Sequence, residues 1–282
     1  MAVKIAVLTD STAYIPEDIL EEYDIHIIPL LVNWGDKSYL DNVDITPEVF
    51  YDRLTKEKEL PTTSQPSAGA FKEKFDELAK RYDGVVAILL SEDLSGTVAS
   101  ALAALEMMES FPVKVINSKL TTMALGLMVI EAAKVAKSGG SLEEVAASAE
   151  ALIGKMRVMF VVDTLEFLHK GGRIGGAQRL LGSMLAMKPL LQLEDGKIVA
   201  LDSVRTKKKA IQTMLGHFYE DAEGKSNIHL TVFQGVAEEE ARTILEEIQA
   251  EKELTDAVLA KLSPVIGVHT GPGTVGMAYY FS

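Results

Sequence analysis

The chain has 282 residues, of which 48% are hydrophobic and 24% charged, a composition typical of globular proteins rather than of disordered or fibrous ones. Its 28 lysines and arginines against 41 acidic residues give a formal net charge of −13, which repels phosphate backbones and argues against nucleic acid as a partner. The absence of cysteine excludes disulfides, thiolate chemistry and cysteine-ligated metals. The apolar runs are too short to span a bilayer, so we expect a cytoplasmic protein without stable membrane insertion.

The first half of the chain alternates apolar runs rich in valine and isoleucine with longer segments of helical period. This alternation is typical of a parallel sheet covered by helices. The runs predicted to form buried strands are residues 3–8, 25–32, 85–90 and 113–116. Helices are predicted to begin at the capping or first-turn residues of this half, which are Pro16, Thr46, Ser67 and Ser141.

The second half changes character after a predicted strand at residues 158–162, because a hairpin follows it. Asp195-Gly196, a pair typical of a type I′ turn, separates the apolar runs 189–193 and 197–202. The other elements predicted in this half are strands at 228–233, 264–269 and 275–281 and helices near 206–219 and 238–251. A hairpin implies antiparallel pairing, so the sheet of this half is predicted to be mixed.

Together these patterns predict a two-domain α/β fold. Residues 1–160 are expected to form a three-layer α/β/α domain with a parallel sheet, and residues 161–282 an α/β domain with a mixed sheet. We expect a ligand to lie between the two domains.

Several common functional motifs are missing. The glycines of residues 271–276 match G-x-G-x-x-G, but only six residues follow, too few to complete a βαβ unit. There is no P-loop, no G-x-S-x-G elbow and no H-E-x-x-H, and the five histidines show no metal-ligand spacing. We therefore expect no metal and no cofactor.

Hydroxyl-rich turns stand instead where predicted strands end, the edge at which open α/β sheets bind ligands. Residues 9–12, Thr-Asp-Ser-Thr, are interpreted as a turn that satisfies backbone amides. In the extended segment 61–67, Ser67 is expected to cap a helix. Thr62, Thr63 and Ser64 have no such structural task, and a binding role and a structural one stay equally open for them.

Residues 94–97, Leu-Ser-Gly-Thr, follow a predicted strand and open a helix. Ser95 offers a hydroxyl, and Gly96 and Thr97 offer backbone N–H groups at the positive end of the helix dipole, which together suit an anion. An ordinary helix cap would use Ser95 but leave Gly96 unexplained. We therefore favour an anion site.

Basic residues gather in two places in this acidic chain. Arg173 stands among four glycines, and Arg205 precedes Lys207, Lys208 and Lys209 at the start of a predicted helix. Such runs are usually a solvated surface, but here they are also candidates for a docking surface. His269, at the end of a predicted strand, is a single histidine of the kind that more often has a structural role.

Six of these segments, in order along the whole chain, resemble the DegV family of fatty-acid-binding proteins, which includes the binding subunits of bacterial fatty acid kinases. They are residues 9–12, 61–67, 94–97, 170–175, 205–210 and 267–273. The resemblance implies a protein that holds one long-chain fatty acid and has no catalysis of its own. It also implies a partner, the catalytic subunit of an ATP-dependent fatty acid kinase, which makes acyl phosphate for phospholipid synthesis from the presented carboxylate.

The resemblance also implies roles for particular residues. Thr63 and Ser95 would bind the carboxylate, with His269 close to it, and Arg173 and Arg205 would face the partner or the phosphorylated head group. The remaining residues of the expected carboxylate site are Ser64, Gly96 and Thr97. The apolar stripes 123–130 and 180–191 are candidates for tunnel walls or for ordinary core.

Two other functions remain open from the sequence. Ser95 as nucleophile and His269 as base would make an acyl-ester hydrolase, although the nucleophile elbow is missing. A lipid-sensing regulatory protein would need only the binding site. Five residues depart from the family pattern without removing a head-group residue, and they are Tyr14, Glu92, Asp93, Asn117 and Ala124.

Overall fold

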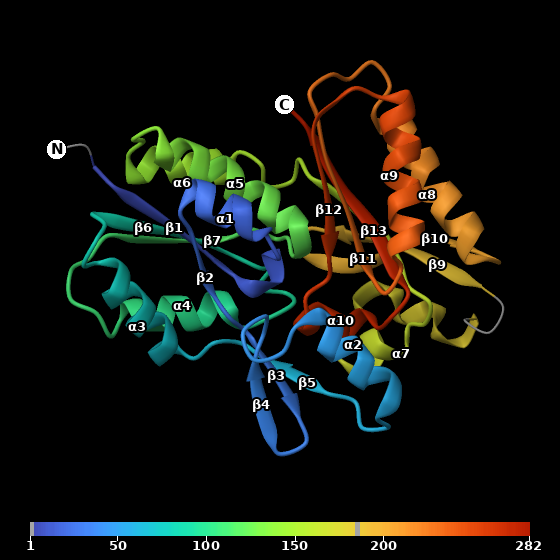
Figure 1. Ribbon diagram of the computed structural model, residues 1–282, viewed down its shortest axis with the longest axis horizontal. Helices are drawn as coiled ribbons and strands as arrows, with labels where there is room; N and C mark the ends of the chain where they lie inside the picture. The colour runs from blue at the N-terminus through green and yellow to red at the C-terminus, as the bar shows by residue number, and fades with distance from the viewer. Residues whose placement is uncertain (1–2, 184–186) are drawn as a thin grey trace.

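A four-stranded parallel sheet forms the centre of the N-terminal domain in the computed structural model, which describes residues 3–183 and 187–282 (Figure 1). Its strands are, in spatial order, β2 (Ile25–Ile28), β1 (Ile5–Asp10), β6 (Gly84–Leu89) and β7 (Val113–Asn117). All three pairings are parallel. β1 and β6 are buried along their whole length, which explains why their sequences are continuous apolar runs without alternation.

Helices cover both faces of this sheet, as predicted. On one face α3 (Ala68–Leu78) and α4 (Thr97–Leu105) bury Phe71 and Phe75 against Ala6 and Leu8 of β1. On the other face lie α1 (Glu17–Tyr23), α5 (Thr122–Lys137) and α6 (Leu142–Glu150), with α5 and α6 above the sheet in Figure 1. The predicted capping box is present at the start of α6. The three-layer α/β/α arrangement is therefore confirmed.

The C-terminal domain contains a six-stranded mixed sheet, also as predicted. Its spatial order is β10 (Lys197–Val204), β9 (Lys188–Glu194), β8 (Arg157–Val161), β13 (Thr274–Phe281), β11 (Ile228–Gly235) and β12 (Leu254–Lys261). Of the described pairings in this sheet, only that of β11 with β12 is parallel. The helices α8 (Lys207–Asp221) and α9 (Glu238–Glu251) pack on its outer face. β8 belongs wholly to this sheet, so the sheets change before residue 157, and the boundary expected after residue 160 stays a prediction.

Two sequence predictions about single elements were wrong. Residues 264–269 form a helix, α10 (Pro264–Thr270), because Ser263 caps it, Pro264 suits its first turn and Gly271 ends it at φ +73°. The run 25–32 is two strands, since Pro29 separates β2 from β3 (Leu31–Trp34). β12 was not predicted at all.

A small antiparallel sheet and several short helices lie below the junction of the domains in Figure 1. The sheet consists of β3 between β4 (Lys37–Leu40) and β5 (Thr62–Ser64). Near it lie α2 (Pro47–Lys56), α7 (Glu166–Lys170) and α10. The remaining short helical segments are η1 (Ser11–Ala13) and η2 (Gly175–Ser183).

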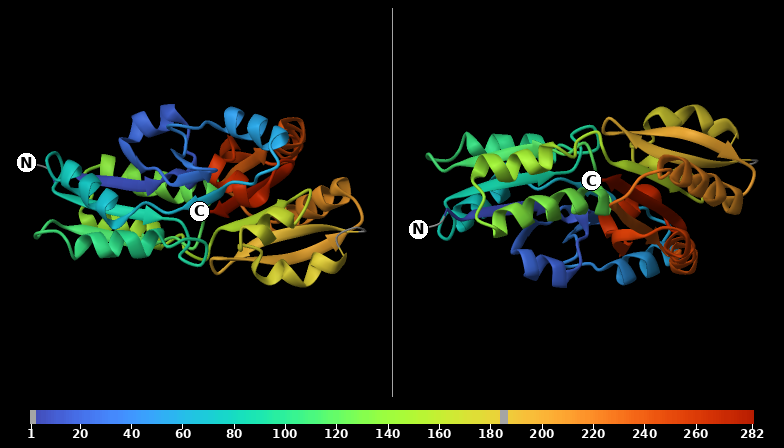
Figure 2. Two further views of the ribbon diagram at one scale, coloured as in Figure 1. Left: turned by 90° about the horizontal axis from the view of Figure 1, so that it is seen from below. Right: turned by 90° about the horizontal axis from the view of Figure 1, so that it is seen from above.

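One apolar core runs through both domains, which lie side by side in Figure 2. Val7 and Ile88 of the parallel sheet belong to the same buried cluster as Val158, Phe160 and Phe233 of the mixed sheet. Strand alternation explains this, because successive residues of β8 point in turn toward the N-terminal domain and toward α8 and α9. The inner face of the mixed sheet is thus an internal surface of the whole molecule.

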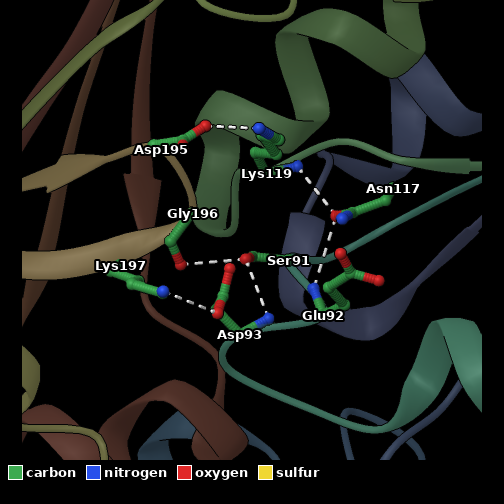
Figure 3. A network of polar contacts seen from close by, with 8 residues as sticks. All are labelled: Ser91, Glu92, Asp93, Asn117, Lys119, Asp195, Gly196 and Lys197. Carbon is green, nitrogen blue, oxygen red and sulfur yellow. Dashed lines mark hydrogen bonds and ion pairs between the residues drawn. The ribbon is translucent and has the colours of Figure 1, made fainter.

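The hairpin β9–β10 reaches across the junction and docks its turn on the N-terminal domain (Figure 3). Asp195 and Gly196 have φ +47° and +84°, as a type I′ turn requires. The Ser91 hydroxyl donates to the Gly196 carbonyl over 2.8 Å, and Lys119 pairs with Asp195. The Lys197 Nζ lies 3.4 Å from the Asp93 Oδ1.

Replacing Gly196 with alanine should loosen this contact. The added Cβ would lie 2.5 Å from the Ser91 Oγ. The alanine would also have to adopt the left-handed backbone conformation of Gly196, which is strained for a residue with a side chain. We expect G196A to lower the free energy of unfolding by about 1–3 kcal/mol in denaturant titrations. G224A is the matched control, because its φ is +66° but no heavy atom lies within 4 Å of the added Cβ. Equal losses in the two variants would show that the docking contributes nothing.

Candidate functional site

The shared core contains a cavity at the junction of the domains. It contains about 730 Å³ of empty space, counting the part that is open to solvent. Its apolar walls come from both domains and are formed by Leu30, Leu90, Leu94, Val158, Phe160, Leu168, Leu193, Ile198, Phe233, Leu262, Val265 and Ile266. Leu193 and Ile198 belong to the docked hairpin, so the hairpin forms part of the wall.

The structure brings together three of the residues predicted for the site. Thr63 on β5, Ser95 in the loop before α4 and His269 on α10 all line this cavity. The Thr63 Oγ1 lies 2.8 Å from the His269 Nε2, across 206 positions of sequence. The Ser95 Oγ lies 2.9 Å from the Thr97 Oγ1. Hydroxyl and imidazole groups thus give an otherwise apolar cavity a polar lining.

His269 is uncharged at neutral pH. Burial, and secondarily the charge of Arg173, lower its pKa to about 4. Its Nδ1 is buried and has no hydrogen-bond partner among the described residues. Gly171 lies directly against this ring, and a Cβ at Gly171 would overlap the Nδ1. The absence of a side chain at residue 171 therefore makes room for the histidine.

Arg173 lines the cavity and joins the two domains. Its Nε donates to the Leu94 carbonyl over 2.9 Å, and its Nη1 donates to the Gly171 carbonyl over 2.7 Å. Leu94 immediately precedes Ser95, so the guanidinium holds the serine loop against the glycine-rich loop. Arg173 has a positioning task in addition to any contact with a partner.

The other predicted residues lie around the cavity rather than on its wall. Ser64 accepts a bond of 3.3 Å from the Asn33 side chain, consistent with the alternation that directs Thr63 inward. Gly96 is the cap residue before α4, and a Cβ there would lie 2.7 Å from the Gln65 Nε2, which explains the glycine through packing. Arg205 is exposed between β10 and α8.

The turn 9–12 has the structural role predicted for it. Asp10 is fully buried and accepts bonds from the backbone N–H groups of Thr12 and Leu90, over 3.0 and 2.7 Å. Of the two apolar stripes, residues 123–130 are buried core and do not line the cavity. Residues 184–186 of the other stripe lie outside the described residues, and none of its described residues is a wall residue.

Asp41 supports the site, although the sequence analysis missed it. Its Oδ1 accepts from the Val265 N–H over 3.1 Å and its Oδ2 accepts from the Ser11 hydroxyl over 2.6 Å. It thereby anchors the start of α10, the helix that carries His269. Burial raises the pKa of Asp41 to about 7. Asp41 is part of no motif, so only the tertiary contacts reveal it.

Neither a membrane-spanning helix nor a metal-binding cluster is found among the described residues. Within 3–183 and 187–282 no helix is both long and apolar enough to cross a membrane. Over the same residues no group of three or more acidic or histidine side chains is placed to hold a metal ion.

The fold and the cavity define a class of protein: two α/β domains that enclose an apolar cavity with hydroxyl groups in its lining. A family model described as an uncharacterised protein of the DegV family matches residues 4–282. Protein DegV of Bacillus subtilis is 37% identical over 278 residues, covering 98% of this chain and 99% of the relative. A DegV domain-containing protein of Clostridium perfringens is 40% identical over 283 residues, covering 99% of each. The chain belongs to the DegV family.

Solved structures of other members have the same fold. A Thermus thermophilus DegV family protein, described by its fatty acid binding, superposes with a TM-score of 0.93 at 35% identity, covering 99% of this chain and 100% of that one. Bacillus subtilis DegV, described as a fatty acid binding protein, gives 0.92 at 37% identity with the same coverage. A stearic acid-binding protein of Eubacterium ventriosum gives 0.89 at 28% identity, covering 98% of both chains.

The raised pKa of Asp41 predicts a pH dependence of stability. Folded Asp41 keeps its proton up to about pH 7, whereas the unfolded chain releases it near 3.8, so the folded state binds more protons in this window. The contribution of Asp41 to stability is therefore full below pH 3.8 and is lost as the pH rises toward 7. An asparagine side chain cannot ionise, so D41N should lose this dependence.

The measurement is the free energy of unfolding of both proteins from about pH 4 to about pH 7. As the pH rises, the free energy of unfolding of D41N should increase relative to that of the parent by a few kcal/mol in total, on the order of 1 kcal/mol for each pH unit. Parallel curves would contradict the raised pKa. Titrating groups that do not interact with Asp41 cancel in the difference.

Proposed function

We propose that this protein binds one long-chain fatty acid between its two domains and presents the carboxylate to a partner kinase. The observation that carries the proposal is the cavity itself, whose walls are apolar except at a few hydroxyl, imidazole and guanidinium groups. Burial of each methylene contributes about 0.8 kcal/mol, so a long acyl tail supplies most of the affinity. The described relatives that bind fatty acids have the same fold over the same length.

The head group is proposed to lie at Thr63, Ser95 and His269. The hydroxyl groups of Thr63 and Ser95 can donate to a carboxylate, and the neutral imidazole of His269 adds no charge. Arg173 lies nearby, but its Nε and Nη1 already bond to backbone carbonyls. A carboxylate held mainly by hydroxyls keeps an oxygen free to attack a phosphoryl donor.

A surface depression supports presentation to a partner. It is lined by Thr63, Arg173 and His269, which also line the main cavity, and by Lys170. The polar groups are therefore accessible from outside through a depression with two cationic side chains, which suits an anionic phosphoryl group. Arg205, exposed on the C-terminal domain, is the further cation proposed to face the partner. Because the kinase requires ATP, the proposal places the protein in the cytoplasm.

The geometry favours binding over ester hydrolysis. The Ser95 hydroxyl is paired with Thr97 and the His269 Nε2 with Thr63, so the two are not arranged as nucleophile and base. An imidazole with a pKa of about 4 is a poor proton acceptor near neutral pH. No carboxylate orients its Nδ1 within the described part of the chain.

Removing the hydroxyls tests the head-group position. T63V and S95A should each weaken binding of a long-chain fatty acid by about 1.5–3 kcal/mol, because a hydrogen bond to a charged acceptor is lost while tail burial is kept. Calorimetric titration of delipidated protein measures the loss. S100A is the matched control, since Ser100 lies on α4 away from the cavity wall. Parent-like affinity in both variants would place the head group elsewhere.

Arg205 tests presentation. R205A should retain fatty acid binding and thermal stability, yet reduce acyl phosphate formation at least tenfold when a fatty acid kinase and ATP are supplied, because docking loses a complementary charge. K225A removes another exposed cation, after α8, and should behave like the parent. If the parent binds fatty acid but supports no acyl phosphate formation, the kinase role fails and the lipid-sensing role takes its place.

A further inference from the structure

The hydroxyl groups along the cavity fall into two classes. Six threonines and serines line it, and four of them bond within the protein, namely Thr63, Ser95, Thr270 and Thr274. The other two, Thr121 and Thr122, have buried hydroxyls without any hydrogen-bond partner in the described structure. Native proteins pair nearly all buried polar groups, so two adjacent exceptions on one cavity wall require an explanation.

Thr121 and Thr122 stand at the start of α5, a helix of 16 residues. Thr122 is only 6% exposed and has φ +58°, a conformation that a β-branched residue rarely adopts. Backbone hydrogen bonds connect this point to the serine loop, since the Ser91 N–H donates to the Leu120 carbonyl and the Ser95 N–H donates to the Ser91 carbonyl. The two free hydroxyls therefore lie on a loop next to the one that carries Ser95.

A saturated acyl chain offers these hydroxyls nothing, because methylene groups neither donate nor accept hydrogen bonds. A second carboxylate is excluded by the cost of burying a charge among apolar walls. A hydroxyl group on the chain is neutral and both donates and accepts, so it satisfies the two threonines and is itself satisfied. The donors and acceptors at residues 121 and 122 match that group.

We infer that Thr121 and Thr122 form a second polar subsite that takes a hydroxyl substituent on the acyl chain, which makes hydroxy fatty acids the preferred ligands of this protein. The inference rests on the proposed function, because it assumes that a fatty acid occupies the cavity. It goes further in naming the chemical class of the chain. The substituent is then bound by residues that follow β7, whereas the head group is bound by Thr63 on β5, Ser95 after β6 and His269 on α10.

The test compares stearate with 2-, 3- and 12-hydroxystearate in titrations of delipidated protein. One isomer should bind about three- to tenfold more tightly than stearate, the gain expected of a net hydrogen bond. In T121V/T122V, which keeps both β-branched shapes, this preference should vanish while stearate binding is kept or improved. T121S/T122S keeps both hydroxyls and should keep the preference.

T270V is the matched control on the same wall. The Thr270 hydroxyl already donates to the Ile266 carbonyl, over 3.2 Å, so its loss should leave the ratio of the two affinities unchanged. If no isomer binds more tightly than stearate, or if the valine variant keeps the preference, the subsite is overturned. If stearate itself does not bind, the proposed function fails instead.

Discussion

The burial of one sheet face from each domain in a common apolar core is the constraint on which the rest of the structure depends. The inner residues of β8 and β11 lie in one buried cluster with residues of the parallel sheet and of α5, so much of their cover comes from the N-terminal domain. The domains are held in a fixed relation by this need, by the docked hairpin turn and by the Arg173 bridge. The cavity lies within that common core, with walls contributed by both domains, and its shape depends on how they pack.

The same burial sets the chemistry of the polar groups. It lowers the pKa of His269 to about 4 and raises that of Asp41 to about 7, in each case because water no longer solvates the charged form. The histidine beside Thr63 is thus a neutral hydrogen-bonding group. Asp41 uses its two oxygens to bind Ser11 and the start of α10, and so places that histidine from a distance. Charge near the proposed head-group site comes from Arg173, whose guanidinium is also a structural bridge.

Family membership and the site geometry contribute different parts of the functional argument. The solved relatives of this fold include fatty acid binding proteins, which supports the ligand class proposed for this protein. The satisfied and unsatisfied hydroxyls of the cavity wall then distinguish positions within it, because Thr63 and Ser95 have partners and, among the described residues, Thr121 and Thr122 have none. Such a distinction depends on contacts, and a family likeness alone does not supply it.

The sequence by itself determined the class of fold. Continuous apolar runs predicted β1 and β6 as buried parallel strands, and Asp195-Gly196 predicted the hairpin, because strand burial and turn conformation are local properties of the chain. Hydroxyl-rich turns and a family resemblance also led to the prediction that Thr63, Ser95 and His269 share one site, and all three line the same cavity. The helix at residues 264–270 has local signals, the cap at Ser263 and Gly271 at its end, but by periodicity a short apolar segment fits a strand or a buried helix equally well, and the structure decided between them. Tertiary structure likewise decided that Ser64 and Gly96 lie off the cavity wall, and that Asp41 positions the site. These outcomes depend on long-range contacts, such as that of Asn33 with Ser64, 31 positions apart, and that of Asp41 with Val265, 224 positions apart. No local sequence pattern encodes contacts of this kind.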